Sequence, residues 1–331
     1  MIIRTFRPGD EAAQVSIYNE AAADLPGFKP ATLDELRRRC HGPDFDPETR
    51  FFALDDAGQP VGYATFHANG RVSFPWCRPG HEAAAEPLFE KVLEAMRGRG
   101  LRRAFAAYRA DWPQGEFFTA RGFRLAREMV NFVVDLVDMP TAAARGGSYI
   151  SPMQREDVPA IFALAPKALR VGTPEELERH LFHNPYFGPD ALFVLRTRRD
   201  GPPVAAGVLI ENPAYADPKK VDAAMPCFRL GAFGTEGMQV KRINGLFSFL
   251  TEPGRDTSPL ALDLMGHAAL RLHHTECECL AAQVPSDVPH LLRFYQQYFR
   301  RQGSFPVYEY DLSSAPSPPT PLPQTGERGG K

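Results

Sequence analysis

The stretch EFFTARGFRLAREMVNFVVDL, residues 116–136, has a parallel near the end of the chain in QYFRRQGSFPVYEYDL, residues 297–312. Both stretches contain, in the same order, an aromatic pair, basic residues, a glycine, another aromatic and an apolar run that closes on Asp-Leu. A glycine after a helical turn is typical of a helix end, and runs rich in Val, Phe and Tyr predict strands. Two segments built alike indicate that the chain contains one structural unit twice.

The segments upstream keep the same register in both halves. Thr32 in TLDEL and Thr173 in TPEEL are 141 residues apart, and so are Phe52 and Phe193 in the strand-like runs that follow. A threonine before an acidic turn predicts a helix start with the threonine as N-cap. The constant offset predicts an internal duplication.

The first helix of each half is expected to begin at an aspartate, Asp10 in RPGDEA and Asp157 in QREDVP, which suits the N-cap. Each half then predicts the order strand, helix, helix, strand, strand, strand, helix, strand, helix, strand. That order builds a mixed sheet covered by helices.

Length and composition place the chain among globular proteins of about two domains, with 331 residues and a net charge of −2. This charge argues against a nucleic-acid partner, and no run of 18 apolar residues predicts a membrane span. Five scattered cysteines favour a reducing cytoplasm. We expect domains at 1–138 and 148–312, a linker at 139–147, an insertion near 211–245 and a disordered Pro-rich tail at 313–331.

The duplicated order, together with the pattern aromatic-x-x-x-Gly, resembles the GNAT superfamily of acyl-CoA-dependent N-acyltransferases. The pattern runs from Phe118 to Gly122 and from Phe299 to Gly303. The tandem form resembles mycothiol-synthase-like proteins. The resemblance implies an α/β (α+β) fold of two GNAT-like domains, each with a mixed, mostly antiparallel sheet flanked by helices.

The resemblance also implies acetyl-CoA as co-substrate, with its pyrophosphate on backbone N–H groups between the fourth strand and the third helix. The family pattern there is Arg/Gln-x-x-Gly-x-Gly/Ala. In the first half the candidate is RPGHEA, made of Arg78, Pro79, Gly80, His81, Glu82 and Ala83. Arg78 and Ala83 match the pattern, whereas His81 replaces its first glycine and Glu82 adds a negative charge. The competing interpretation is a helix start capped by its own glutamate.

The second half offers two frames for this loop, QVKRIN at 239–244 and EPGRDTS at 252–258. The second frame lies 51 residues before Gly303, closer to the 44 residues that separate Arg78 from Gly122. We therefore prefer it, with Gly254, Thr257 and Ser258 as phosphate-binding candidates. Because the first half keeps more of the pattern, we expect weak acetyl-CoA binding there.

The catalytic residues are less evident, because phenylalanines occupy both slots in which the family carries its general-acid tyrosine. In the second half Tyr298 is our candidate acid, with Tyr295 close by, and Tyr108 is the nearest tyrosine in the first half. Each could equally be a packing aromatic. Glu252 is positioned like the family's general base, and its alternative is a solvated turn residue.

No metal site is expected, since the spacing in HHTECEC, residues 273–279, fits no standard zinc site. The function implied by the resemblance is acetyl transfer to the amine of a small molecule or peptide. The alternative is a catalytically silent duplicated scaffold that binds a ligand or a protein partner, which the degenerate loops favour.

Overall fold

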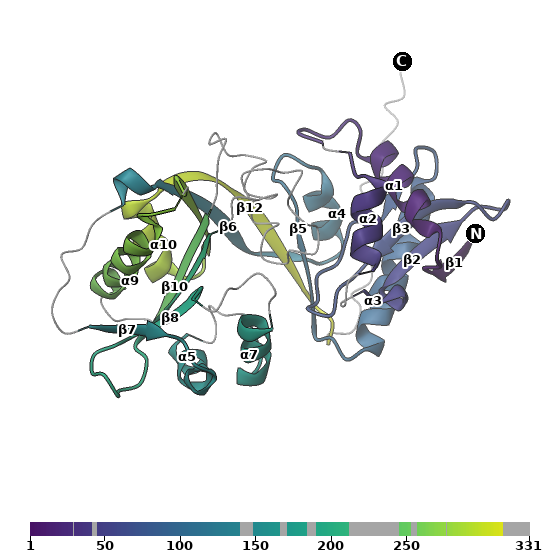
Figure 1. Cartoon of the computed structure of the whole chain (residues 1–331). Helices are drawn as coiled ribbons and strands as arrows, with labels where there is room; N and C mark the ends of the chain where they lie inside the picture. The colour runs from purple at the N-terminus through teal and green to yellow at the C-terminus, as the bar shows by residue number, and fades with distance from the viewer. Residues whose placement is uncertain are drawn as a thin grey trace, which may run out of the picture. The chain divides into compact units, whose positions relative to one another are not determined.

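The computed structural model describes residues 1–28, 30–41, 45–139, 148–165, 171–183, 190–211, 245–252, 257–275 and 277–313. Its contacts divide the chain into two compact units (Figure 1). Unit 1 comprises Met1–Arg127 with Phe305–Lys331, and unit 2 comprises Glu128–Ser304.

The first repeat follows the expected order. Its elements are β1 Ile2–Thr5, α1 Asp10–Ala21, α2 Leu33–Cys40, β2 Arg50–Leu54, β3 Pro60–Thr65, β4 Trp76–Cys77, α3 Ala85–Gly98, β5 Arg103–Ala107, α4 Gln114–Ala120 and β6 Arg124–Asp135, with short 3-10 turns η1 Pro47–Thr49, η2 Glu82–Ala84 and η3 Leu136–Asp138. Strands β1 to β4 form an antiparallel sheet in that order.

Both faces of this sheet are covered, and strand β2 shows why. Successive strand residues point to opposite faces. Phe51 packs into the core beneath α3, where Leu88 and Val92 are buried, whereas Phe52 packs with Ile17 of α1. The apolar stripe of α3 and the alternation in β2 therefore place one helical layer on each side.

The second repeat has the same order. Its elements are β7 Tyr149–Pro152, η4 Arg155–Asp157, α5 Val158–Leu164, α7 Pro174–Phe182, β8 Leu192–Arg196, β9 Ala205–Glu211, β10 Gly245–Thr251, α9 Thr257–Leu272, β11 Cys279–Pro285, α10 Pro289–Tyr298 and β12 Arg300–Asp311. Strands β7 to β10 are antiparallel neighbours, and β10 and β11 pair in parallel. The expected mixed, mostly antiparallel sheet is confirmed.

The predicted helix starts are partly confirmed. The Thr32 hydroxyl accepts a hydrogen bond from the Glu35 amide at 3.3 Å. The Thr173 hydroxyl accepts one from the Glu176 amide at 3.2 Å, so both threonines act as N-caps.

Neither aspartate side chain caps the helix that follows it. Asp10 comes one residue after the N-cap Gly9, and Asp157, at the N-cap position of α5, reaches back into the preceding turn. Asp10 accepts the amide of Arg7 at 2.6 Å, and Asp157 accepts the amide of Gln154 at 3.0 Å. A tight turn three residues long brings these amides within reach of the carboxylates. Both repeats share this device.

The last strand of each repeat pairs with a strand of the other repeat. Within unit 1, β5 pairs antiparallel with residues 307–311 of β12, the final strand of the second repeat. Within unit 2, β11 pairs antiparallel with residues 129–135 of β6, the final strand of the first repeat. Each unit is thus completed by the last strand of the other repeat, and the domain boundaries at 138 and 148 stay a prediction.

The connecting segments of the sequence prediction lie mostly outside the described residues, which end at 139 before the linker and at 313 before the tail. Met139 is described and is buried in a core of unit 2. Residues 212–244 also lie outside, but Glu211 of β9 pairs with Gly245 of β10. These strands are the third and fourth of the second repeat, and the insertion near 211–245 stays a prediction.

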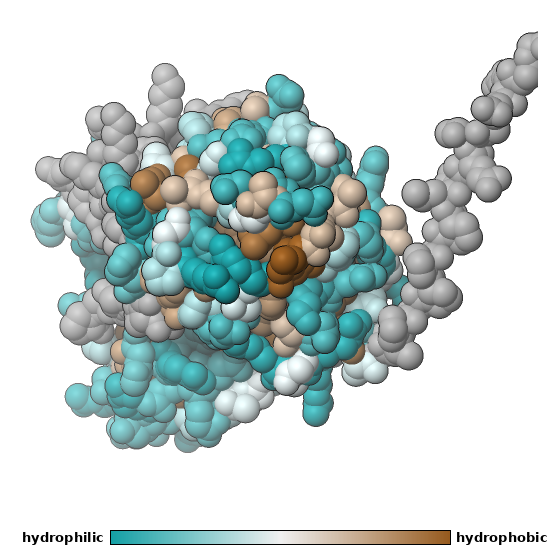
Figure 2. Space-filling view, turned by 90° about the vertical axis from the view of Figure 1, so that its right-hand side faces the viewer, coloured by the Kyte–Doolittle hydropathy of each residue, from teal (hydrophilic) through white to brown (hydrophobic). Residues whose placement is uncertain are grey.

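Two surface observations complete the fold. In the described part of the chain, none of the helices is both long and apolar enough to cross a bilayer. The face shown in Figure 2 is mostly hydrophilic and carries a small hydrophobic patch. A patch of this size is ordinary for a protein surface, and we assign it no role.

Candidate functional site

Two neighbouring parallel strands in the sheet of unit 2 are paired over only part of their length. The parallel strands β10 and β11 are paired at Gly245 with Leu280 and at Leu246 with Ala281. Both strands continue, to Thr251 and Pro285, while the other edge of β10 stays paired with β9 along its whole length. Backbone N–H and C=O groups on the free edge of β10 need other partners.

The side chain of Tyr295, from α10, supplies those partners. Its ring is 2% exposed and its hydroxyl donates to the carbonyl of Phe247 at 3.4 Å. Burial raises the pKa of Tyr295 far above its usual value, and interactions with Ser248 and the Phe249 backbone oppose that rise without cancelling it. A neutral phenol therefore faces the middle of β10.

Aromatic rings enclose this hydroxyl. The Tyr295 ring lies 5.8 Å from that of Phe132, 5.3 Å from Phe249 and 4.9 Å from Phe299, measured between centroids. Electrostatic interactions are stronger in such a dry environment than in water.

Unit 1 has a related arrangement with a different tyrosine. The hydroxyl of Tyr108, which follows β5, accepts the amide of Phe74 just before β4 at 2.5 Å. Burial raises the pKa of Tyr108 to about 12. Its ring stacks on Phe118, the fully buried phenylalanine of the family's tyrosine slot. Trp76 and Phe117 pack around Phe74 in this space.

The candidate phosphate loop of unit 1 uses its own groups internally. Gly80 has φ +85°, and its amide donates to the Glu82 carboxylate at 2.9 Å. Hydrogen bonds from the Glu82 and Gly80 amides hold the pKa of Glu82 below its usual value. The Arg78 guanidinium bonds Glu20, with one contact of 2.5 Å, and Ser16 at 3.1 Å. A carboxylate thus occupies an amide that a phosphate would use, and the cofactor-binding role of Arg78–Ala83 stays a prediction.

The other members of that loop are exposed. Pro79, His81 and Ala83 are solvent-accessible, and residues 82–84 form a 3-10 turn before α3 begins at Ala85. The hydrogen bond of the Gly80 amide to Glu82 is the contact that the competing interpretation of this sequence, a helix start capped by its own glutamate, predicts.

The second frame of the loop in unit 2 has the strand and helix expected around it, β10 before Glu252 and α9 from Thr257. Glu252 is exposed. Gly254 and residues 239–244 lie outside the described residues. Thr257 and Ser258 open α9, and their side chains are not described. The phosphate-binding role of these residues stays a prediction.

Tyr298 is half-buried and packs on Phe294 at 4.8 Å between centroids, whereas Tyr295 reaches the edge of β10. Helical spacing does not separate the two, because Tyr295 follows the buried Leu291 by four residues and Tyr298 follows the buried Phe294 by four. The coordinates make the distinction.

A buried polar atom lies in the first turn of α10. The Nε2 of His290 is inaccessible to solvent and has no hydrogen-bond partner among the described residues. Burial and the charge of Arg293 lower the pKa of His290.

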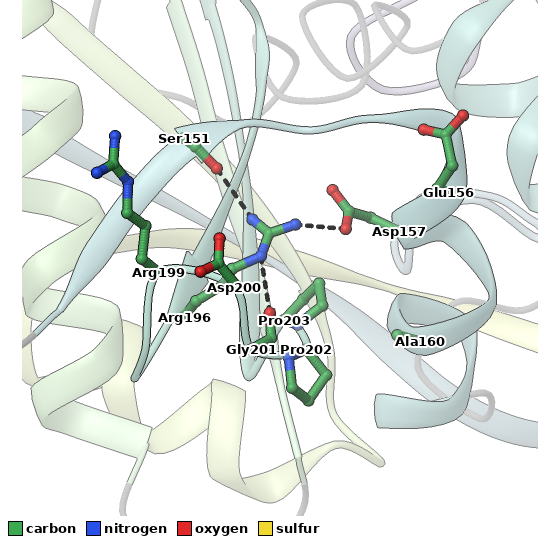
Figure 3. Close-up of a pocket in the computed structure, with 10 residues that line it drawn as sticks. All are labelled: Ser151, Glu156, Asp157, Ala160, Arg196, Arg199, Asp200, Gly201, Pro202 and Pro203. Carbon is green, nitrogen blue, oxygen red and sulfur yellow. Dashed lines mark hydrogen bonds and ion pairs between the residues drawn. The ribbon is translucent and has the colours of Figure 1, made fainter.

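A separate pocket of about 460 Å³ lies between β7, η4, α5 and the β8–β9 hairpin (Figure 3). At its centre the guanidinium of Arg196 bonds Asp157 at 2.5 Å, Ser151 at 2.9 Å and the Gly201 carbonyl at 2.9 Å (Figure 3). Arg196 is bonded to Asp157 at the start of α5, the first helix of the second repeat. Its guanidinium is therefore already engaged and does not provide a binding group for an anion in this pocket.

Comparison with known sequences gives partial matches. No protein-family profile matches the chain. A mycothiol acetyltransferase from Acidothermus cellulolyticus is 37% identical over 107 residues, which are 31% of this chain and 32% of that protein. One from Streptomyces bingchenggensis is 35% identical over 130 residues, 37% of this chain and 42% of that protein. The matches thus span less than half the length of these relatives.

Solved structures match along nearly the whole chain. A GCN5-related N-acetyltransferase from Sphaerobacter thermophilus aligns with a TM-score of 0.58 and 15% identity over 94% of this chain and 95% of that one. A tandem GNAT protein from the clavulanic acid biosynthesis pathway aligns with a TM-score of 0.55 and 12% identity, covering 95% and 99%. At such identities the likeness establishes the fold alone, and the fold expected from the sequence is confirmed.

Proposed function

We propose that this chain, whose fold is that of tandem GNAT proteins, is an acyl-CoA-dependent N-acetyltransferase that carries out its reaction in unit 2. The partial matches to mycothiol acetyltransferases support the acyl-transfer chemistry. We further propose acetyl-CoA as the acyl donor and the amine of a small molecule or peptide as the acceptor.

The single observation that carries the placement in unit 2 is the contact of Tyr295 with the free edge of β10. Phe249 lies two residues beyond Phe247 in β10, so its amide points to the same edge as the carbonyl that accepts the Tyr295 hydroxyl. An acyl carbonyl placed between β10 and β11 would accept a hydrogen bond from the Phe249 amide. A fixed backbone donor at the developing oxyanion is the usual source of stabilisation in acyl transfer.

Tyr295 would then have a second role as general acid. Its phenol stays neutral because burial raises its pKa, so the proton is present when a thiolate leaves. Tyr298, the acid proposed from the sequence, packs against Phe294 and has no comparable place beside β10. We therefore assign the acid role to Tyr295.

The surroundings of the reaction follow from charge and cysteine state. A net charge of −2 supports a small or peptide acceptor over nucleic acid. Among the described residues Cys77 and Cys277 form no disulfide, which supports the reducing cytoplasm as the compartment.

The alternative of a catalytically silent scaffold is favoured by unit 1. There Glu82 occupies the amide of Gly80, and the Tyr108 hydroxyl occupies the amide of Phe74. These contacts support a silent unit 1 beside an active unit 2.

Thiol release tests the proposal. The full chain is incubated with acetyl-CoA and a panel of primary amines that includes glucosamine, cysteine and lysine-containing peptides, and free CoA is measured with a thiol reagent. We expect one amine class to accelerate release above hydrolysis and isothermal titration to give one acetyl-CoA site per chain. If the chain does not bind acetyl-CoA, the proposed acetyltransferase activity is wrong and the catalytically silent scaffold remains as the proposal.

A further inference from the structure

Aromatic side chains gather between α1, β4 and the loop that joins β5 to α4 in unit 1. Trp76 of β4 lies at their centre and is 5% exposed. Its ring lies edge-on to Tyr18 of α1 at 5.1 Å and to Trp112 at 6.3 Å, measured between centroids. Phe74 meets it in the same way at 5.1 Å. Tyr18 and Trp112 are half-buried, so this aromatic cluster reaches the surface and is suited to receiving a further ring.

The chain supplies such a ring itself. Phe28 packs on Tyr18 at 5.8 Å between centroids, and both rings lie against the core that contains Trp76. Phe28 is half-buried and follows Ala21, the last residue of α1, by seven residues. It belongs to a connecting segment, so it covers the aromatic cluster without being part of the sheet. Phe28 therefore occupies a position that the ring of a bound ligand would take.

The segment that carries Phe28, residues 22–28, is held at its tip by the loop between β5 and α4. The indole N–H of Trp112 donates to the Pro26 carbonyl at 2.8 Å. Gly27 has φ +64° and lies so close to Arg109 that an added Cβ would be 2.7 Å from its Nη1. Pro26 and Gly27 are both exposed, so these contacts at the tip can break without unpacking the core.

The same segment is folded on itself and fixed at its base. The amides of Leu25 and Phe28 donate to the carbonyls three residues before them, each at 3.0 Å. At the base, the side chain of Asn19 in α1 exchanges two hydrogen bonds with the backbone of Ala31, at 2.7 and 3.0 Å. Releasing the tip leaves these bonds intact. A compact loop with a fixed base and a lightly held tip can move as a unit.

We propose that residues 22–28 form a lid over a ligand site in unit 1, and that Phe28 holds the place of the ligand's ring while the lid is closed. The ligand class follows from the side chains that would receive it. Tyr18 and Trp76 present aromatic surface, so the site takes a planar aromatic group. The inference goes beyond acetyl transfer, because the site uses none of the groups assigned to that reaction in unit 2.

Competition between Phe28 and the ligand sets the affinity that is measured. While the lid is closed the site is filled, so the apparent dissociation constant is the intrinsic constant divided by the open fraction. Removing the Phe28 ring removes the competitor. Loosening the tip of the lid raises the open fraction and leaves the rings of the site in place.

Binding of phenol to the full chain tests the lid, with cyclohexanol as a non-aromatic probe of similar size. In ligand-observed NMR titrations, Phe28→Ala should bind phenol about tenfold more tightly than wild type, and cyclohexanol by less than about threefold more tightly. The control is Phe45→Ala, which removes another half-buried phenylalanine of unit 1 that packs on Phe6 at 5.2 Å. This control should bind phenol as wild type does.

Trp112→Phe is a second variant, in which a ring remains at position 112 but the donor to Pro26 is lost. Its affinity for phenol should rise by about threefold. By hydrogen exchange with mass spectrometry, the amides of residues 22–28 should exchange faster than in wild type while those of β2 stay unchanged. Equal phenol affinities of Phe28→Ala and Phe45→Ala, an equal gain for cyclohexanol, or unchanged exchange of residues 22–28 in Trp112→Phe overturns the proposal.

Discussion

The amide of Gly80 and the carboxylate of Glu82 are hydrogen-bonded to each other at 2.9 Å in the loop after β4. A glycine amide at a helix start is a group that binds phosphate oxygen in many proteins. In unit 1 the anion is the chain's own Glu82 carboxylate, which occupies the Gly80 amide. The expectation of acetyl-CoA binding in the first half is therefore not favoured, and we propose unit 2 in its place.

Replacing Glu82 tests this directly. In Glu82→Gly the Gly80 amide is freed and a negative charge leaves the helix start, so we expect a second, weak acetyl-CoA site to appear in isothermal titration. A charge removed at a helix start changes anion affinity by about two- to five-fold. Glu90→Gln, which removes an exposed charge further along α3, is the control and should leave one site. Two sites in the wild-type chain would contradict the interpretation.

The two tyrosines of α10 give a matched pair of substitutions. Tyr295→Phe removes the hydroxyl that donates to the Phe247 carbonyl, so kcat should fall by about 10²-fold or more. The loss also leaves that buried carbonyl without its donor and should lower the free energy of unfolding by about 1–2 kcal/mol.

Tyr298→Phe is expected to keep kcat, since the ring packing on Phe294 remains. Steady-state kinetics and chemical denaturation of both variants check the assignment. If Tyr298→Phe is the variant that loses kcat, the acid is the one proposed from the sequence.

The exchange of final strands predicts how truncation acts. Removing residues 305–331 deletes the strand that pairs with β5 and the side chain of Tyr310, which stacks on Phe123. Unit 1 should then lose its cooperative unfolding transition. Both tryptophans, Trp76 and Trp112, belong to unit 1, so their fluorescence reports this unit alone.

Removing only residues 314–331 should leave the free energy of unfolding within about 0.5 kcal/mol, because the Pro-rich composition offers little apolar surface for packing. The fragment 1–138 should likewise fold only when the fragment 148–313 is added. A fragment 1–138 that unfolds cooperatively by itself would show that its own last strand can replace β12.

Much of the fold followed from local signals in the sequence. The 141-residue offset linking Thr32 to Thr173 located equivalent helix starts, and the alternation in β2 located a two-sided sheet. The exchange of β6 and β12 could not be predicted, because the two strands share the same pattern and either would satisfy the same edge. Whether β5 pairs with β6 or with β12 depends on the tertiary arrangement, and the alternation of apolar residues along a strand does not determine it.

The site was predicted less well, for a related reason. The pattern around Gly80 identified the right loop, but only the coordinates show the Glu82 side chain bending back onto the amide. Counting four residues back from Gly303 gave Phe299, although α10 ends one residue earlier and directs Tyr295 at β10. A motif spacing carries over between proteins only when the helix ends at the same residue.

The ion pair of Arg4 with Asp10 predicts a pH dependence of stability confined to unit 1. The two side chains are 19% and 9% exposed and their charged atoms are 2.6 Å apart. Burial disfavours the charged carboxyl, but the hydrogen bonds from Arg4 and the Arg7 amide outweigh it, so the pKa of Asp10 lies below its ordinary value. The folded state therefore binds fewer protons than the unfolded state, and this stabilisation is present above about pH 4 and lost as the pH falls through the folded pKa.

In Asp10→Asn the amide oxygen still accepts the Arg7 amide, but Arg4 loses its counter-charge. We expect the free energy of unfolding at neutral pH to fall by about 2–4 kcal/mol, and the difference from wild type to shrink at pH 3. Asp34→Asn, an exposed carboxylate in the first turn of α2, should stay within about 0.5 kcal/mol of wild type at both pH values. Urea denaturation followed by the fluorescence of Trp76 and Trp112 measures all three proteins. A difference between Asp10→Asn and wild type that is the same at both pH values would show that Asp10 stabilises unit 1 through its hydrogen bond alone.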